Sequence, residues 1–148
     1  MNNSLKSVGI ASDHAGYRMK QQLITFLRDF VPEIKDFGTD SAESMDYPDV
    51  AHPLAVAVEN GSVDMGIALC GSGNGVCMTL NKHQKIRAAL CWNEELARLA
   101  RLHNDANIIC IPARFTELPQ AREMTKIFLE TPFEGGRHSN RVNKIKCE

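Results

Sequence analysis

The sequence predicts an α/β fold, in which helices cover both faces of a parallel sheet. Short runs of β-branched and apolar residues alternate with longer segments whose apolar residues have helical spacing. The 148 residues, 43% of them hydrophobic, are enough for one ordinary domain with one core. We therefore expect a single domain over residues 1–148, a three-layer α/β/α, Rossmann-like arrangement with a five-stranded parallel sheet.

The first two strand–helix units lie in the N-terminal third of the chain. The apolar run at residues 8–11 predicts a strand, and the spacing of the apolar residues that follow predicts a helix over residues 16–30. A weaker strand at residues 34–37 and a helix over residues 50–58 form the second unit. The polar loop between them, residues 38–48, is long enough to carry function.

The third unit is the clearest in the sequence. A buried strand at residues 65–70 runs into a glycine loop at residues 71–75, and a helix is expected over residues 76–82. The backbone N–H groups of such a loop can bind a phosphate, a carboxylate or an enolate oxygen. The third glycine comes one residue too early for the dinucleotide fingerprint, which disfavours a nucleotide cofactor.

The remaining units complete the sheet and leave a basic tail. Thr116 is a candidate N-cap of the last long helix. After Pro132 the chain is too basic and too poor in apolar residues to belong to the core. The expected elements of this part are strands at residues 86–91 and 107–111 and helices at residues 93–103 and 117–129.

Charge and composition exclude several classes of protein. The net charge of −1 gives no overall attraction to nucleic acid or to an anionic membrane. The apolar runs reach about five residues, whereas a bilayer span needs about 20, and no signal peptide is expected because polar residues interrupt the N-terminus. Five cysteines without a Cys-x-x-Cys pair argue against a disulfide framework and a zinc knuckle, so we expect reduced thiols in a cytoplasmic protein.

Candidate chemistry lies just beyond the predicted strands, where open α/β sheets bind ligands. Cys70 ends a strand at the start of a helix, where the helix dipole and loop amides can lower the pKa of a thiol. A small buried hydrophobe is the alternative interpretation of Cys70. Asp13 and His14 close the first strand, and Asp13 is equally suited to function and to capping the next helix.

Three basic residues of the C-terminal half have two interpretations each. His103 shares the apolar face of its predicted helix, which favours a packed histidine, but the C-terminal end of a helix also favours the protonated ring of a general acid. Arg137 and Arg141 are four residues apart and would form a phosphate clamp if the tail is helical. Arginines on a solvated tail are also common without a function. His52 and His83 read as structural or surface residues.

Seven short motifs follow one another along the chain: SDHAG (residues 12–16), DYP (46–48), CGSG (70–73), NK (81–82), IRA (86–88), RLHNDAN (101–107) and EGGRH (134–138) followed by RV (141–142). In this order they resemble the type B ribose-5-phosphate isomerases and the related galactose-6-phosphate isomerase subunits. Each motif alone is weak, but the ordered set covers nearly the whole chain and is specific.

The resemblance implies an aldose–ketose isomerase of the non-oxidative pentose phosphate pathway, which interconverts ribose 5-phosphate and ribulose 5-phosphate through a cis-enediolate. His103 would open the sugar ring with help from Asp13, and Cys70 as a thiolate would move the proton between C2 and C1. Ser72 would stand near the reacting oxygens. No metal and no organic cofactor are implied.

The resemblance also implies how substrate and subunits are arranged. The enzyme would be a homodimer or a dimer of dimers, with the active site at the subunit interface and the basic tail packed on the partner. It would bind a small sugar phosphate and neither nucleic acid nor membrane. The implied substrate-binding residues are Asp13, His14, Tyr47, Gly71, Ser72, Gly73, Asn74, Gly75, Asn104, Arg114, Arg137 and Arg141.

The chain departs from the family pattern at one position, and two alternative functions remain. Some family members carry a glutamate base after the glycine loop, where this chain has Val76, so Cys70 is the only base that the resemblance leaves. A six-carbon substrate, allose 6-phosphate or galactose 6-phosphate, is the near alternative because the loop does not fix the depth of the pocket. A non-catalytic phosphate- or nucleotide-binding module would use the loop and the tail arginines only to hold an anion.

Overall fold

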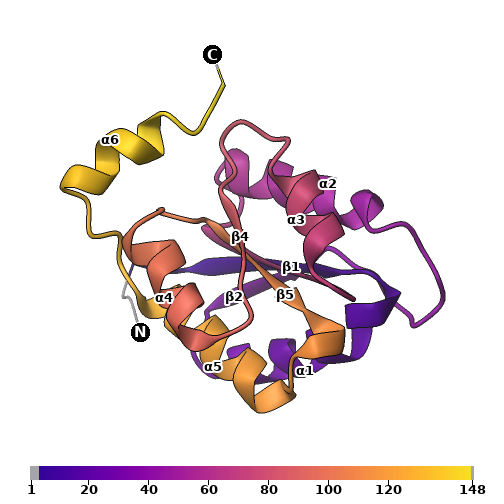
Figure 1. Ribbon diagram of the computed structural model, residues 1–148. Coiled ribbons are helices and arrows are strands. Elements are labelled where there is room, and N and C mark those ends of the chain that lie inside the picture. The colour runs from indigo at the N-terminus through magenta and orange to yellow at the C-terminus, as the bar shows by residue number, and fades with distance from the viewer. Residues whose placement is uncertain (1–3, 148) are drawn as a thin grey trace.

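The computed structural model describes residues 4–147 and confirms the expected parallel sheet (Figure 1). Its five strands have the order β2-β1-β3-β5-β4, and every pairing is parallel. The strand order reverses between β1 and β3, and open α/β sheets bind their ligands at such a switch point. The strands are β1 (Ser7–Ser12), β2 (Glu33–Asp36), β3 (Met65–Cys70), β4 (Ala88–Leu90) and β5 (Ile108–Pro112).

Helices cover both faces of the sheet, which makes the three layers that the sequence predicts. One face carries α1, α4 and α5, and the other carries α2 and α3 (Figure 1). No helix within residues 4–147 is long and apolar enough to cross a membrane. The helices are α1 (Tyr17–Leu27), α2 (Pro48–Glu59), α3 (Asn74–Leu80), α4 (Glu94–Leu102), α5 (Leu118–Glu130) and α6 (Arg137–Asn143), with short 3-10 turns η1 (His14–Gly16) and η2 (Ala113–Phe115).

The two faces of the sheet are packed with side chains of different size. Large residues such as Ile67 and Ile109 face the α1, α4 and α5 layer. Small residues such as Ala68 and Cys110 face α2 and α3. A Cβ on Gly9 would lie only 2.7 Å from Leu54 Cδ1, so α2 can approach the sheet closely only because that position is glycine. Strands β3 and β5 are buried on both sides, as expected of central parallel strands.

Three local expectations need correction. Thr116 does not cap the last long helix: its hydroxyl donates to the Pro112 carbonyl at 2.8 Å, and Glu117 occupies the cap position without a side-chain cap bond. The fourth strand is shorter than expected and begins at Ala88. The first helix, expected over residues 16–30, is shorter: α1 begins at Tyr17, after the separate turn η1 that Asp13 caps, and ends at Leu27.

A buried ion pair joins α1 to the end of β2. Lys20 is fully buried, and its Nζ donates to both carboxylate oxygens of Asp36 at 2.8 and 2.9 Å. Asp36 Oδ1 also accepts from the backbone N–H of Gly38, whose carbonyl accepts from the N–H of Ser12 at 2.7 Å. This chain of contacts fixes the end of β1 directly before Asp13.

We expect the two partners of this ion pair to differ in their effect on stability. Asp36→Asn keeps an acceptor for Gly38 but leaves the ammonium of the buried Lys20 without its counter-charge, and we expect it to lower the free energy of unfolding by about 3 kcal/mol. Lys20→Met leaves Asp36 partly hydrated and should cost about 1 kcal/mol or less. Urea denaturation at pH 7 measures both values. Equal losses for the two variants would contradict the asymmetry.

Candidate active site

The ends of three neighbouring strands meet at one edge of the sheet. Because β1, β3 and β5 are adjacent and parallel, Ser12 lies beside Leu69 and Cys70 lies beside Pro112. Backbone hydrogen bonds continue beyond the strands, from Asp13 N to Leu69 O at 3.2 Å and from Arg114 N to Gly71 O at 3.0 Å. The segments after these strands therefore form one surface at the switch point.

Asp13 is a helix cap as well as a buried carboxylate at this edge. Its Oδ1 accepts from the N–H groups of Ala15 at 2.9 Å and Gly16 at 3.2 Å. The residue is only 7% exposed. The capping interpretation is thus confirmed, and the two N–H donors also fix the direction in which the carboxylate faces.

The glycine loop after β3 makes a turn that needs glycine at its centre. Gly73 has a φ of +77°, and a Cβ there would lie 3.2 Å from the backbone nitrogen of Pro112. The loop is short, because α3 begins at Asn74 rather than at the expected residue 76. Ser72 is exposed, and its Oγ accepts from the N–H of Asn74 at 3.3 Å.

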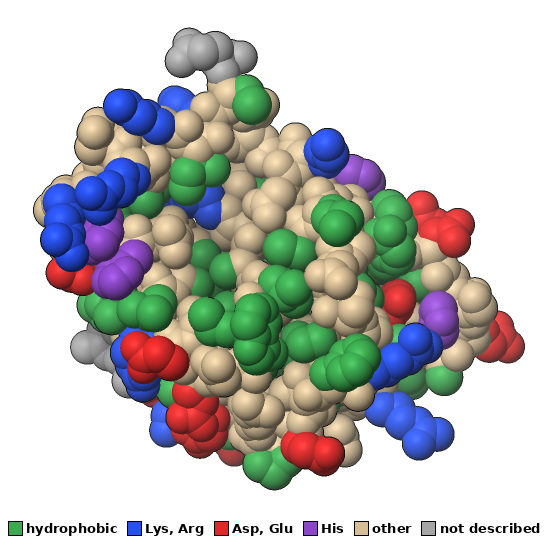
Figure 2. Space-filling model, in the orientation of Figure 1, with side chains coloured by type: hydrophobic (Ala, Val, Ile, Leu, Met, Phe, Trp, Pro, Cys, Tyr) green, Lys and Arg blue, Asp and Glu red, His purple; other side chains and the backbone are tan. Residues whose placement is uncertain are grey.

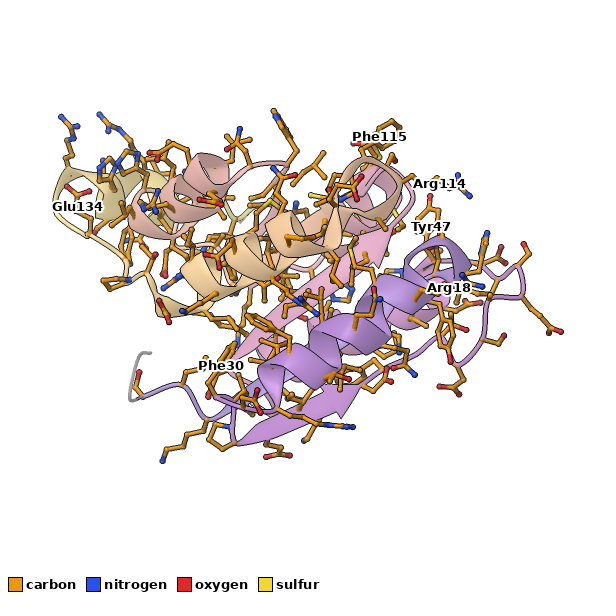
Figure 3. All side chains as sticks on the ribbon, turned by 90° about the horizontal axis from the view of Figure 1, so that it is seen from below. Arg18, Phe30, Tyr47, Arg114, Phe115 and Glu134 are labelled. Atoms are coloured by element: carbon orange, nitrogen blue, oxygen red, sulfur yellow. The ribbon has the colours of Figure 1, made fainter. Side chains whose placement is uncertain are left out.

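Two side chains from other loops cover the glycine loop. A Cβ on Gly75 would lie 2.6 Å from Cε1 of Tyr47, so the tyrosine ring packs directly on this glycine. The guanidinium of Arg114 covers Gly71, where a Cβ would lie 3.1 Å from Nη1. Figure 3 shows Tyr47 and Arg114 at the same end of the molecule.

His14 anchors the loop that carries Tyr47. Its Nδ1 accepts from the backbone N–H of Met45 at 3.2 Å, which joins the turn after β1 to the long loop after β2. Both segments follow neighbouring parallel strands and so lie at the same edge of the sheet, where the ring of His14 holds them together. This bond could not be read from the sequence.

Cys70 is the last residue of β3 and is 4% exposed, in the small-residue layer beneath α2 and α3. Among the other thiols, burial raises the pKa of Cys91 to about 12 and the pKa of Cys110 well above its ordinary value. A hydrogen bond from Cys110 is the main cause that lowers the pKa of Cys77. All five cysteines are free. Cys70 is thus a buried, free thiol that directly precedes the glycine loop.

A second group of predicted residues lies elsewhere, at the C-terminal end of α4. The ring of His103 stacks on the ring of His138 from α6, with centroids 4.2 Å apart and planes 14° apart. Glu134 Oε2 lies 3.6 Å from His103 Nε2 and 3.9 Å from His138 Nε2. The pKa of His138 is lowered, first by burial and then by the charge of His103.

The tail forms the expected helix, and its arginines are exposed. Arg137 and Arg141 begin and end one turn of α6, whose buried residue is His138. Figure 2 shows Lys and Arg side chains gathered over this helix, next to histidine side chains. His103, Asn104, His138 and Arg141 line a cavity of about 530 Å³ together with apolar residues of β4 and α4.

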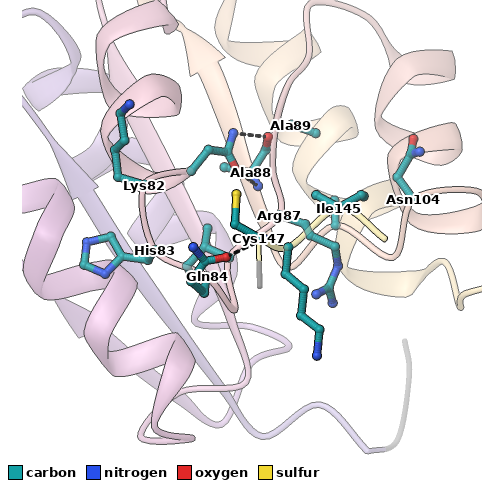
Figure 4. A pocket seen from close by; sticks show the side chains of 13 residues that line it. Lys82, His83, Gln84, Arg87, Ala88, Ala89, Asn104, Ile145 and Cys147 are labelled. Carbon is teal, nitrogen blue, oxygen red and sulfur yellow. Dashed lines mark hydrogen bonds between the residues drawn. The ribbon is translucent and has the colours of Figure 1, made fainter. Parts of the chain in front are cut away.

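A neighbouring cavity shares Asn104 with this one (Figure 4). It also has a volume of about 530 Å³, and it lies between residues 81–89 and the C-terminal segment. The backbone N–H of Cys147 donates to Gln84 Oε1 at 2.8 Å and holds that segment in place. Among residues 4–147, no residue of the glycine loop lines either of these two cavities.

The two groups lie at opposite edges of the sheet. Helix α4 runs back against the strands, so His103 at its end lies near the start of β5, whereas Cys70 lies beside the end of β5. Five residues of β5 correspond to about 16 Å. Figure 3 shows Glu134 at one end of the molecule and Tyr47 and Arg114 at the other. One chain therefore brings together Asp13, Cys70, Tyr47, the glycine loop and Arg114, but not His103 or the tail arginines.

A doubly wound parallel sheet with a cysteine before a glycine loop at its switch point defines an open α/β protein with a candidate ligand site at this edge. A family described as Ribose/Galactose Isomerase matches residues 8–145, and the chain belongs to that family. It is 38% identical over 141 residues to ribose-5-phosphate isomerase B of Escherichia coli, and the match covers 95% of each chain.

Solved structures of relatives have the same fold along nearly the whole chain. Ribose-5-phosphate isomerase B of Clostridium thermocellum is 45% identical, with a TM-score of 0.92 and 94% of each chain covered. The enzyme from Mycoplasma genitalium, solved with bound ribulose 5-phosphate, is 39% identical with a TM-score of 0.90, and the match covers 94% of this chain and 93% of that one. These matches agree with the resemblance found in the sequence.

The contact between Tyr47 and Gly75 gives a test of the site geometry. We expect Gly75→Ala to displace the tyrosine ring and lower the free energy of unfolding by about 1–3 kcal/mol. In a Tyr47→Ala background the same change should be neutral or slightly stabilising, because alanine favours the helix that contains residue 75. Urea denaturation of the four proteins of this double-mutant cycle measures the coupling. An equal cost in both backgrounds would contradict the packing.

Proposed function

We propose that this protein interconverts ribose 5-phosphate and ribulose 5-phosphate. The observation that carries the proposal is the position of Cys70 at the end of β3, beside the glycine loop and next to Asp13 and Arg114. Membership of the Ribose/Galactose Isomerase family supports the proposal. Relatives named ribose-5-phosphate isomerase B also support it, and one of them was solved with bound ribulose 5-phosphate. The site offers a base, a cluster of backbone donors and a carboxylate, which together suffice for proton transfer next to a carbonyl.

The proposed reaction moves one proton between two carbons. His103 donates a proton to the ring oxygen while Asp13 accepts the proton of the hydroxyl at C1, and the sugar opens to an aldehyde. The thiolate of Cys70 then removes the proton from C2 and returns it to C1, while the hydroxyl proton of O2 passes to O1. In the intermediate cis-enediolate, negative charge forms on oxygen, and N–H groups from Gly71 to Gly75 with the hydroxyl of Ser72 would stabilise it; such donors contribute about 10²–10³ in rate elsewhere.

The phosphate would bind to the arginines of the tail. Arg137 and Arg141 are exposed on one turn of α6, so both guanidinium groups can reach one anion. His14 would assist at the other edge of the site. Further substrate contacts are proposed for Tyr47, Gly73, Asn74, Asn104 and Arg114.

The split between the two edges of the sheet supports a site shared by two copies. His103 and Asn104 cannot reach Cys70 within one chain, but in a dimer the tail of one copy can lie against the glycine loop of its partner. An isologous dimer would contain two such sites. We therefore propose a homodimer or a dimer of dimers in the cytoplasm, a location that the five free cysteines favour.

Two other functions are weaker candidates. A six-carbon sugar phosphate is compatible with a family described as Ribose/Galactose Isomerase. A phosphate-binding module without catalysis would use the loop and the arginines alone, but it gives no role to a thiol at the switch point. Turnover of ribose, allose and galactose phosphates by the same preparation ranks the candidates.

Cys70→Ala should abolish isomerisation and leave sugar-phosphate binding nearly intact. The thiolate is the base, whereas the loop amides and arginines hold the substrate, so we expect kcat to fall by at least about 10³. Formation of ribulose 5-phosphate after EDTA treatment measures turnover, and calorimetric titration measures binding. Cys147→Ala is the matched control, because this thiol is exposed near the C-terminus. Strong residual turnover in Cys70→Ala would remove Cys70 from the base role.

A shared site predicts that two inactive variants restore each other. When Cys70→Ala and His103→Gln chains are refolded together, half of the dimers are mixed, and each mixed dimer contains one intact site. Activity should return to roughly a quarter of the wild-type value. Cys70→Ala mixed with Asp13→Asn is the control, because both residues lie on the same edge and no intact site can form. Absence of recovery in the first mixture, with mixed dimers present, would contradict a site built from two copies.

A further inference from the structure

Three potential metal ligands meet where the tail joins α4. They are Nε2 of His103, Oε2 of Glu134 and Nε2 of His138, and ligand atoms of these residues lie within 4.8 Å of one another. His103 caps the end of α4, His138 lies in the first turn of α6, and Glu134 lies in the segment between α5 and α6. The backbone N–H of Glu134 donates to the Leu102 carbonyl at 3.0 Å, which holds the carboxylate beside His103.

His138 is an unusual residue in this cluster. Its side chain is 9% exposed, and Nε2 has no hydrogen-bond partner among the described residues. A buried polar atom without a partner costs free energy, so such an atom in a folded protein calls for an explanation.

We propose that His103, Glu134 and His138 bind a divalent transition-metal ion, Zn²⁺ above all, and that the bound ion blocks isomerisation by occupying His103. Two imidazoles and one carboxylate form a three-ligand set that leaves a fourth position for water. The nitrogen ligands favour Zn²⁺, Co²⁺ or Cu²⁺ over Mg²⁺ and Ca²⁺, which prefer oxygen.

The two distances between the Glu134 carboxylate and the imidazoles require only small movements. Ligand atoms of a tetrahedral zinc site are about 3.4 Å apart when each bond is about 2.0–2.1 Å long. Glu134 Oε2 lies 3.6 and 3.9 Å from the two Nε2 atoms, so each contact must shorten by a few tenths of an ångström. The lone pairs of the two imidazoles lie in their ring planes, which are only 14° from parallel, so at least one ring must rotate substantially out of the stack before both nitrogens point to one ion.

The inhibitory part of this proposal rests on the function proposed above, but the binding part does not. A ring that is bound to zinc through Nε2 cannot donate a proton from that atom. The ion would also fix α6 to α4, next to the arginines that we expect to hold phosphate. Zinc and the sugar phosphate should therefore compete for the same surface.

Direct binding tests the site without any substrate. ZnCl₂ is titrated calorimetrically into protein that carries Cys147→Ala, because an exposed thiol would bind zinc by itself. We expect one ion per chain, and affinity at least about tenfold weaker in Glu134→Gln and in His138→Gln. His83→Gln is the matched control: it removes a second histidine pair, in which His52 Nδ1 and His83 Nε2 are 2.7 Å apart, and should leave the affinity unchanged.

Two further measurements test which residues bind the metal ion and whether the bound ion inhibits isomerisation. Co²⁺ takes the same ligands as Zn²⁺, and its visible absorption should be that of a four-coordinate ion in the parent protein and be lost in Glu134→Gln. In turnover assays, Zn²⁺ should inhibit reversibly with EDTA, and the inhibition curve should shift in Glu134→Gln by the same factor as the affinity.

The outcomes separate this proposal from the proposed function. Equal zinc affinity in the parent, Glu134→Gln and His138→Gln proteins would overturn the site, as would loss of binding in His83→Gln alone. Zinc binding at the expected ligands without inhibition of an active isomerase would overturn the blocking role. Lack of turnover on any sugar phosphate would count against the proposed function, while the binding titration would still decide the metal site.

Discussion

The common direction of the five strands determines where every functional group lies. Because all strands point one way, each segment that follows a strand opens at the same edge, and each helix returns its C-terminal end to the other edge. The order β2-β1-β3-β5-β4 then makes β1, β3 and β5 neighbours, so Asp13, Cys70 and Arg114 come together although a hundred residues separate the first from the last. The same rule places His103 at the far edge, so the division of the proposed site between two edges follows from the common strand direction.

Capping and chemistry are compatible roles for Asp13. A carboxylate that accepts two backbone N–H bonds through one oxygen is held in a single orientation. In the proposed reaction, a substrate hydroxyl would therefore meet a fixed acceptor and would not need to order a mobile side chain. The buried pair of Lys20 and Asp36 extends this support, since it holds the segment that pairs with Ser12 directly before Asp13. Stability and site geometry thus depend on the same contacts at this edge.

Sequence patterns predict the local secondary structure, but they do not predict contacts between residues that are far apart in the chain. Hydrophobic spacing identified all five strands and the layer structure, and motif order identified the family, which the comparisons confirm. Spacing could not give the strand order, because pairing joins segments far apart in the chain. Thr116 was misplaced because a hydroxyl before a helix can bond either to that helix or back to the preceding strand. The buried position of Lys20 was missed because its partner Asp36 lies on another element.

The contact between His138 of the tail and His103 at the end of α4 links two proposed functional groups, the acid and the phosphate-binding arginines. Helix α6 buries His138, and this ring stacks on His103 at the end of α4. Arg137 and Arg141 stand on either side of His138 in the same helix, so any movement of the stack moves both the proposed acid and the proposed phosphate clamp. The carboxylate of Glu134 lies 3.6 Å from Nε2 of His103 and 3.9 Å from Nε2 of His138, so it belongs to the same contact. A short helix with little core of its own can therefore place acid and arginines together, provided that a second copy supplies the edge on which they act.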